Sequence, residues 1–260
     1  MAITHQKKIA FFLLIFCCCT AFTYARQSPQ AIFDNANDQL QSGNYQQAIA
    51  LYKKLEAENT VSGALFLNLG ISYQRIDSLG KAKFYFLKAS HFEETQDQAK
   101  QALDFIETQF SRQSAVLPKL PWDVATDWLR YNIGASNLLL IGVIVLNLAI
   151  LLYIVQWFID WYPKYLKIGA LTLLGLAVIV IGSGFYTHYV DNRYHTAVMV
   201  TKKVPVLNKP QKDASLVSQA FEGYTFTVDK YKSNNSSGWS YVRMSNGLYG
   251  WIPSDQIMIL

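Results

Sequence analysis

The stretch LLLIGVIVLNLAILLYIVQWF, Leu138 to Phe158, holds 21 residues without one charged side chain. A helix needs about 20 apolar residues to cross the hydrocarbon core of a bilayer, so this stretch is long enough to span a membrane. After a connection of nine residues a second uncharged stretch follows, IGALTLLGLAVIVIGSGFY, Ile168 to Tyr186. Both stretches are apolar on every side, whereas a surface helix of a soluble protein is apolar on one side only. The sequence therefore predicts a membrane hairpin of two helices.

We place the first membrane helix at 137–159, the connecting loop at 160–165 and the second membrane helix at 166–187. Lys164 and Lys167 lie in or beside the loop, and basic residues near a span favour the cytoplasmic side. The loop is therefore expected in the cytoplasm. The segments before and after the hairpin are then both expected on the outer face of the plasma (inner) membrane, in the periplasm.

Three residues of the predicted hairpin are candidates for intramembrane contacts, namely Asn147, Gly175 and Gly182. A polar amide inside a bilayer seeks a hydrogen-bond partner, and glycine lets two helices approach closely. The partner is either the other helix of the hairpin or a second membrane protein. The sequence leaves both alternatives open.

The chain begins with a pattern typical of a secretory signal peptide, which we place at 1–25. Two lysines precede a short apolar run, and Thr23 and Ala25 supply the small residues of a cleavage site. Three adjacent cysteines at 17–19 would leave with this peptide. A lipoprotein that keeps one acylated cysteine is the alternative, but the small residues that usually precede such a cysteine are missing. Export agrees with an outward-facing N-terminal domain.

A repeat of 34 residues lies between the signal peptide and the hairpin. When NANDQLQSGNYQQAIALYKKL (35–55) is laid over LGISYQRIDSLGKAKFYFLKA (69–89), small residues align with small ones and Tyr52 aligns with Phe86. This period is that of the tetratricopeptide repeat (TPR), in which two antiparallel helices form one unit. We therefore predict a TPR domain at 26–112 with two repeats and a capping helix; an unrelated pair of helical hairpins is the alternative. The expected helices are 29–42, 45–58, 61–76, 79–92 and 95–112.

In this architecture the first helix of each pair lines a concave face that binds peptides. The residues expected on that face are Asn37, Gln41, Asn68, Ile71, Gln74 and Arg75. Asn37 and Asn68 resemble the asparagines with which some TPR proteins hold a C-terminal carboxylate, although the lysines of that clamp are missing. A solvated polar face is the alternative.

Residues 113–136 are expected to form a linker and a short helix on the membrane surface. Trp122, Trp128 and Tyr131 stand among charged residues there, and amphipathic aromatic rings prefer the interface between lipid and water.

The segment 195–260 reads as short β-rich runs separated by turn signals. One of these signals is Asn246-Gly247, which suits a tight hairpin. Five or six strands in about 65 residues indicate a small closed barrel. Its expected core residues are Val206, Phe226, Val228, Val242 and Ile252.

Three glycine-containing motifs give this barrel a family resemblance. Glu222-Gly223, Gly238-Trp239 and Gly250-Trp251-Ile252 follow the order seen in bacterial SH3-like (SH3b) domains, which the segment resembles. The early segment Val206-Leu207-Asn208-Lys209-Pro210 lacks the Arg and Gly that family members often carry there. The resemblance implies a module that binds cell-wall peptides or proteins. Rim residues that serve either as a ligand shelf or as barrel packing are Trp239, Tyr241, Tyr249 and Trp251.

The predicted fold class is thus a multidomain membrane protein with all-α helical repeats, a transmembrane helical hairpin and a small all-β SH3-like barrel. This order of modules resembles the tetratricopeptide proteins of the Bacteroides aerotolerance operon, the BatE family. The resemblance implies a complex with von Willebrand A-domain membrane proteins and a MoxR-type ATPase, and a role in envelope stress or aerotolerance.

Composition and motifs argue against a nucleic-acid-binding protein, an enzyme and a metal-binding protein. The formal net charge of +5 is spread thinly along the chain, without the dense basic stripe of a nucleic-acid-binding protein. No nucleophile elbow or phosphate-binding loop stands in a recognisable frame, and the four histidines lack metal-ligand spacing. We therefore expect a non-enzymatic scaffold without cofactor or metal, whose partners are membrane proteins and the lipid bilayer. The first alternative is a receptor or sensor for peptidoglycan, and the second is an envelope hydrolase.

Overall fold

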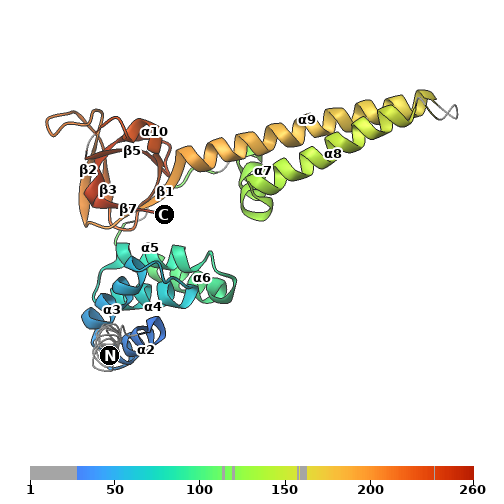
Figure 1. The fold of residues 1–260 in the computed structure, drawn as a ribbon. Coiled ribbons are helices and arrows are strands. Elements are labelled where there is room, and N and C mark those ends of the chain that lie inside the picture. The colour runs from blue at the N-terminus through green and yellow to red at the C-terminus, as the bar shows by residue number, and fades with distance from the viewer. Residues whose placement is uncertain (1–27, 113–114, 119–120, 157, 159–162, 237) are drawn as a thin grey trace, which may run out of the picture. The chain divides into compact units, whose positions relative to one another are not determined.

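The computed structural model describes residues 28–112, 115–118, 121–156, 158, 163–236 and 238–260 (Figure 1). The predicted signal peptide and part of the predicted cytoplasmic loop lie outside these residues. The chain divides into two compact units. The first consists of residues up to Asp77 with Tyr85–Lys100, and the second of Ser78–Phe84 with Gln101–Leu260.

The N-terminal part of the chain is helical, and each helix lies within the range predicted for it. The elements are α2 (Pro29–Gln41), α3 (Tyr45–Ala57), α4 (Gly63–Arg75), α5 (Leu79–Ala89), the 3-10 turn η1 (Glu93–Thr95) and α6 (Gln96–Glu107). Serine side chains cap two of the helix starts. Ser28 Oγ accepts a hydrogen bond from the Ala31 N–H (3.2 Å), and Ser62 Oγ accepts one from the Leu65 N–H (3.1 Å). Each cap satisfies a backbone donor that the first helical turn leaves without a partner.

The 34-residue register places its small and large members together in the interior of the first unit. Ala36, Ala48, Tyr52 and Phe86 are all fully buried. A Cβ atom added to Gly70 would lie 2.4 Å from two ring carbons of Phe86, so only glycine allows the ring this position. Close approach of α4 and α5 thus depends on a residue without a side chain.

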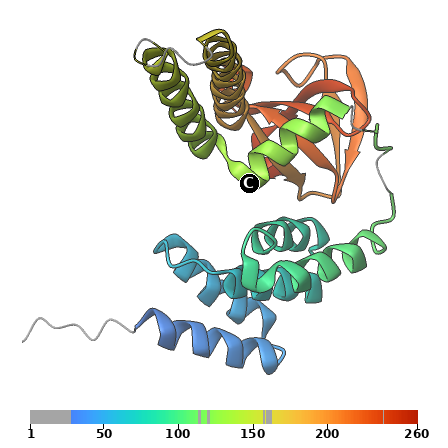
Figure 2. The same cartoon turned by 90° about the vertical axis from the view of Figure 1, so that its right-hand side faces the viewer.

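Two long apolar helices follow the short helix α7 (Pro121–Trp128) and the π-helical turn η2 (Leu129–Ile133). They are α8 (Ala135–Val155) and α9 (Pro163–Arg193), which lie side by side (Figures 1 and 2). Both are long and apolar enough to cross a membrane, and only 17% of the most apolar window of each is buried. A core helix of a soluble protein would be mostly buried, so this exposure favours a lipid environment.

Small residues bring α8 and α9 together. Added Cβ atoms at Gly142 and Gly184 would lie 2.5 Å from Ile181 Cγ1 and 2.9 Å from Leu139 Cδ2, respectively. Ala177 is fully buried in the same seam. Helices in membranes associate through such small residues because lipid supplies no hydrophobic drive between them.

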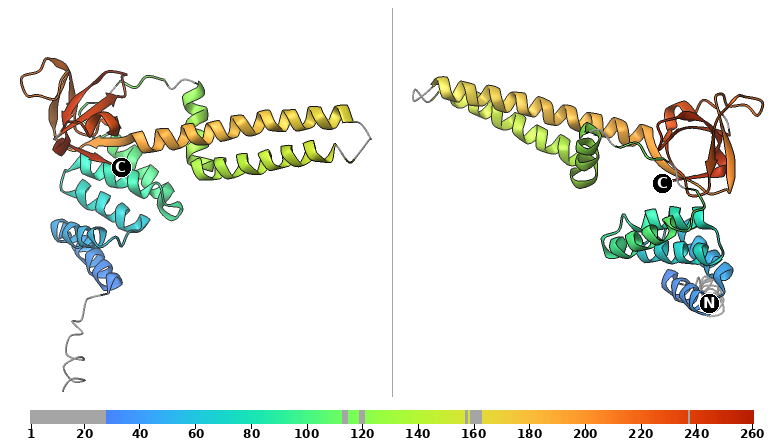
Figure 3. Two further views of the ribbon diagram at one scale, coloured as in Figure 1. Left: turned by 45° about the horizontal axis from the view of Figure 1, so that its top comes forward. Right: turned by 180° about the vertical axis from the view of Figure 1, so that it is seen from behind.

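The C-terminal part is a seven-stranded antiparallel sheet in the order β3-β2-β6-β5-β4-β1-β7. The strands curl into a barrel (Figure 3). They are β1 (Tyr194–Met199), β2 (Lys203–Leu207), β3 (Leu216–Phe221), β4 (Thr225–Asp229), β5 (Trp239–Met244), β6 (Tyr249–Pro253) and β7 (Ile257–Ile259), with the short helix α10 (Lys230–Ser233) after β4 and the 3-10 turn η3 (Ser254–Gln256) before β7. β7 was not among the predicted strands, and it pairs with β1.

The five residues predicted for the barrel core are confirmed, since each is at most 2% exposed. The backbone geometry also explains why the three motifs carry glycine. Gly223 and Gly238 adopt φ angles of 82° and 79°, which favour glycine. A Cβ atom at Gly250 would lie 2.5 Å from Val206 Cγ1 and 2.8 Å from the Leu207 carbonyl oxygen, so β6 can approach β2 only with glycine there.

Candidate functional site

The outward side of β5 and β6 carries four aromatic residues, which we call the aromatic face: Trp239, Tyr241, Tyr249 and Trp251. In β5 the inward residues Ser240, Val242 and Met244 are buried, so the alternate positions point away from the barrel core. Tyr241 is paired with Trp251 across the two strands. The rim residues predicted from the sequence therefore share one surface.

Three rings of the aromatic face, those of Tyr241, Tyr249 and Trp251, contact one another and two cations. Tyr241 stacks on Tyr249 with centroids 6.1 Å apart, and it meets Trp251 edge to face at 5.1 Å. Lys232 Nζ lies 4.2 Å from the centre of the Tyr241 ring, and the Arg243 guanidinium lies 5.6 Å from that of Tyr249. Such contacts between a cation and a ring are favourable. The result is an aromatic surface with a basic border, and Tyr249 is 50% exposed on it.

Helix α10 is held beside this face by hydrogen bonds. Asp229 caps the helix, accepting a bond from the Lys232 N–H at Oδ1 (3.1 Å). Ser233 Oγ accepts a bond from the Tyr241 N–H (2.9 Å), which joins α10 to β5. Lys232 therefore has a fixed place next to Tyr241.

The predicted concave-face asparagines are brought together in the first unit. Asn68 Nδ2 donates to Asn37 Oδ1 (2.9 Å), and the hydroxyl of Tyr52 donates to the same oxygen (2.6 Å). Burial raises the pKa of Tyr52 to about 12, so the hydroxyl keeps its proton at neutral pH. This network uses the carbonyl oxygen of Asn37 internally.

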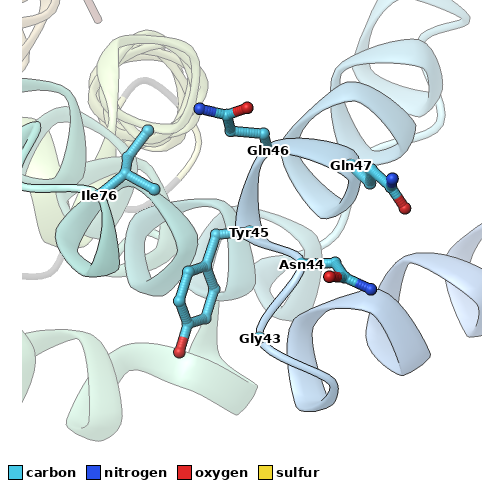
Figure 4. A pocket seen from close by; sticks show the side chains of 6 residues that line it. All are labelled: Gly43, Asn44, Tyr45, Gln46, Gln47 and Ile76. Atoms are coloured by element: carbon cyan, nitrogen blue, oxygen red, sulfur yellow. The ribbon is translucent and has the colours of Figure 1, made fainter.

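The other residues predicted on the concave face are partly or fully exposed: Gln41, Ile71, Gln74 and Arg75. A separate hollow of about 300 Å³ lies where the turn between α2 and α3 faces the end of α4. It is lined by Gly43, Asn44, Tyr45, Gln46, Gln47 and Ile76 (Figure 4). The lining has polar side chains but no charged one.

The predicted intramembrane residues lie on the outer surface of the hairpin. Asn147 is exposed, and its side-chain Nδ2 donates to the Val143 carbonyl oxygen of the same helix (2.8 Å). Added Cβ atoms at Gly175 and Gly182 would meet nothing within 4 Å. The seam between α8 and α9 is instead made by Gly142 and Gly184. The three predicted residues thus lie on the outer surface of the helix pair, away from the seam.

The predicted interfacial segment forms α7 and η2, where Trp128 and Tyr131 are 57% and 67% exposed. The side chain of Trp122 lies outside the described residues. Arg130 in η2 binds Asp191 near the end of α9, with Nε and Nη2 each 2.7 Å from Oδ1. This ion pair joins the interfacial segment to the second apolar helix. Within the described ranges, no group of three or more His, Cys, Asp or Glu side chains could hold a metal ion.

The sheet topology, the motif glycines and the outward aromatic rings define a small SH3-like barrel. Residues 206–257 match the family described as the bacterial dipeptidyl-peptidase Sh3 domain. The match extends from β2 to the start of β7 and includes all four residues of the aromatic face. No curated protein and no solved structure matches the chain.

Sequence reasoning missed two partners of the predicted residues. Tyr52 was assigned to packing alone, although its hydroxyl also binds Asn37. Lys232 carried no signal in the sequence, because its contact with Tyr241 depends on the turn of α10 between β4 and β5.

Proposed function

We propose that this protein is a non-enzymatic adaptor anchored in the plasma membrane, with two interaction modules on its outer side. The observation that carries the proposal is the aromatic face of the barrel, a solvent-facing cluster of rings bordered by Lys232 and Arg243. Exposed rings of this kind supply large contact area at small entropic cost, which suits them to peptide or protein recognition. The helical repeats provide the second module.

The membrane anchor in this proposal is the hairpin of α8 and α9. Lys164 and Lys167 at the start of α9 stay in the cytoplasm, and α9 leads outward to the barrel. The signal peptide exports the helical repeats to the same side. Both modules then face partners in the periplasm, and Asn147, Gly175 and Gly182 are available for a partner within the bilayer.

The partners we infer are membrane proteins. The resemblance to the aerotolerance family points to von Willebrand A-domain proteins and to a role in envelope stress tolerance. The paired amides of Asn37 and Asn68 support peptide binding by the repeats, because an amide both donates and accepts hydrogen bonds.

The adaptor is tested by purification from solubilised membranes after cross-linking. The full chain is expected to bring down membrane proteins, and replacing both Tyr241 and Trp251 by serine is expected to remove those that the barrel binds. Leu216→Ser is the matched control, because Leu216 is 57% exposed on β3, away from the aromatic face. Equal recovery with the double variant and the wild type would contradict a binding role for this face.

A receptor for peptidoglycan is the second candidate, and the family match of residues 206–257 favours it. Retention on purified cell-wall sacculi separates the two functions. If the wild type is retained and the double variant at Tyr241 and Trp251 is not, the receptor is correct. If neither is retained while membrane proteins co-purify, the adaptor is correct.

Sidedness is tested with reporters that are active only in the cytoplasm. One reporter inserted near Pro163 is expected to be active, and one fused after Leu260 is expected to be silent. The opposite pattern would place both modules in the cytoplasm and overturn the proposal.

A further inference from the structure

Helix α9 continues beyond the predicted membrane span and enters the barrel without a linker. The span was predicted to end at 187, yet the helix runs to Arg193 and β1 begins at Tyr194. With a rise of 1.5 Å per residue, Arg193 lies about 10 Å beyond Tyr186 along the helix axis. The headgroup layer is about 5 to 8 Å thick on each side of a bilayer. When α9 spans a membrane, its last turn therefore lies at the outer edge of the headgroups.

An ion pair fixes α10 beside this last turn. Arg193 donates from Nε (3.1 Å) and Nη2 (2.8 Å) to Asp229 Oδ2, and the other oxygen of Asp229 caps α10. Asp229 is 6% exposed. Burial alone would raise the pKa of its carboxyl group, but the hydrogen bonds from Arg193 and the Lys232 N–H hold that pKa below its usual value. The carboxylate is therefore charged at neutral pH and forms an ion pair with Arg193, which we call the clamp.

Basic and aromatic side chains surround this junction, and we call them the collar: Tyr189, Arg193, Lys230, Tyr231 and Lys232. Tyr189 and Tyr231 are 49% and 72% exposed, and the Arg193 guanidinium lies 5.5 Å and 5.8 Å from the centres of their rings. Lys230 and Lys232 are exposed on α10. The nearby acid Asp191 is paired with Arg130 and so does little to offset the collar's charge.

We propose that the collar binds the headgroups of anionic phospholipids and so holds the barrel against the membrane surface. The inference rests on the proposed membrane span of α9. Basic residues within a Debye length of an anionic surface are attracted to it, and tyrosine rings are enriched at the headgroup level. The collar places basic side chains and tyrosine rings at the level of the headgroups. The binding restricts the aromatic face to ligands that reach the membrane surface.

The test uses the full chain reconstituted in vesicles, with its three natural cysteines replaced by serine. A fluorophore is attached to a cysteine replacing Asn234, which is exposed at the end of α10. A matched probe replaces Lys212, which belongs to the loop between β2 and β3. This loop lies on the side of the barrel opposite α9 (Figures 1 and 3). Lipids that carry a quencher on the headgroup are expected to quench the probe at 234 more in vesicles containing phosphatidylglycerol than in pure phosphatidylcholine. The probe at 212 should not respond.

The lysines of the collar provide the decisive variant. Each lysine near an anionic surface strengthens the attraction about fivefold, so Lys230→Ser with Lys232→Ser should weaken the attraction of the collar to the anionic surface about 25-fold and reduce the quenching of the probe at 234. Equal quenching in neutral and anionic vesicles, or no effect of the double variant, would overturn the inference. Alkaline extraction of the same vesicles keeps the two proposals apart. Release of the chain would refute the membrane span itself, whereas retention without lipid-dependent quenching refutes only the collar.

Discussion

Replacing Gly70 by alanine tests the packing between α4 and α5. The added Cβ atom would lie 2.4 Å from the Phe86 ring, whereas carbon atoms in contact prefer 3.5 to 4.0 Å, so the overlap is about 1 Å. Phe86 is fully buried and cannot swing into solvent. Overpacking of this kind costs about 1 to 3 kcal/mol, and alanine in place of glycine within a helix returns about 1 kcal/mol. We expect a net loss of up to about 2 kcal/mol in the free energy of unfolding.

Gly70→Ala should stabilise the protein instead of destabilising it once the Phe86 ring is removed. Phe86→Ala alone is expected to cost about 3 to 5 kcal/mol, because it leaves a cavity in the interior. In that background Gly70→Ala meets no ring and keeps only its helix-forming advantage, so it should stabilise the helices by about 1 kcal/mol. If the effect of Gly70→Ala on stability changes sign in this way, the contact between the added Cβ atom and the Phe86 ring is the cause of the loss.

Hydrogen exchange followed by mass spectrometry measures this effect locally, on peptides from α4 and α5. Ala36→Gly is the control, because alanine occupies the equivalent position one repeat earlier and is also fully buried. It should lose about 1 kcal/mol, since the helix there already accommodates a Cβ atom. If Gly70→Ala changes the free energy of unfolding equally with and without Phe86, the packing argument is wrong.

Three further predictions concern stability and binding. The pKa of Asp229 is lowered in the folded state, so its contribution to barrel stability is present at neutral pH and is lost as the pH falls below about 4. Asp229→Asn should therefore reduce the difference between the melting temperatures at about pH 7 and about pH 3, measured by tryptophan fluorescence. An unchanged difference would contradict this. Tyr241→Ala should weaken ligand binding by about 2 kcal/mol or more in a titration with the identified partner, because central aromatic residues dominate interfaces, whereas an unchanged affinity would exclude the aromatic face. Asn37→Ala should lower the free energy of unfolding of α2 and α3 by about 1 to 3 kcal/mol, because it leaves the buried Tyr52 hydroxyl without its acceptor. Asn37→Asp keeps an acceptor and should lose less. Equal losses of stability for the two variants, measured by hydrogen exchange, would show that the bond from Tyr52 to Asn37 does not stabilise the helices.

The apolar hairpin could be predicted from the sequence, but not the sides on which its helices meet. The uncharged stretches 138–158 and 168–186 mark the apolar parts of these two helices. A helix that is apolar all round, however, gives no signal for its packing side. Gly175 and Gly182 were therefore as plausible in the seam as Gly142 and Gly184, and the choice depends on how the two helices fit together.

The barrel core was predicted because strand alternation places every second residue inside. The clamp between Arg193 and Asp229 was not predicted, since the two residues are far apart in the sequence and meet only through the pairing of β1 with β4. β7 was missed because its three residues are too few to show alternation. Contacts between distant charged residues likewise follow no local pattern.

The direct passage from α9 into β1 makes the barrel share any tilt of the helix. A span that exceeds the local hydrocarbon thickness tilts to keep its apolar residues in lipid. If α9 spans a membrane as proposed, it would lean further in a thinner bilayer, and the barrel would turn with it, since no flexible joint lies between Arg193 and Tyr194. The direction in which the rings of β5 and β6 point would then report the thickness of the surrounding membrane.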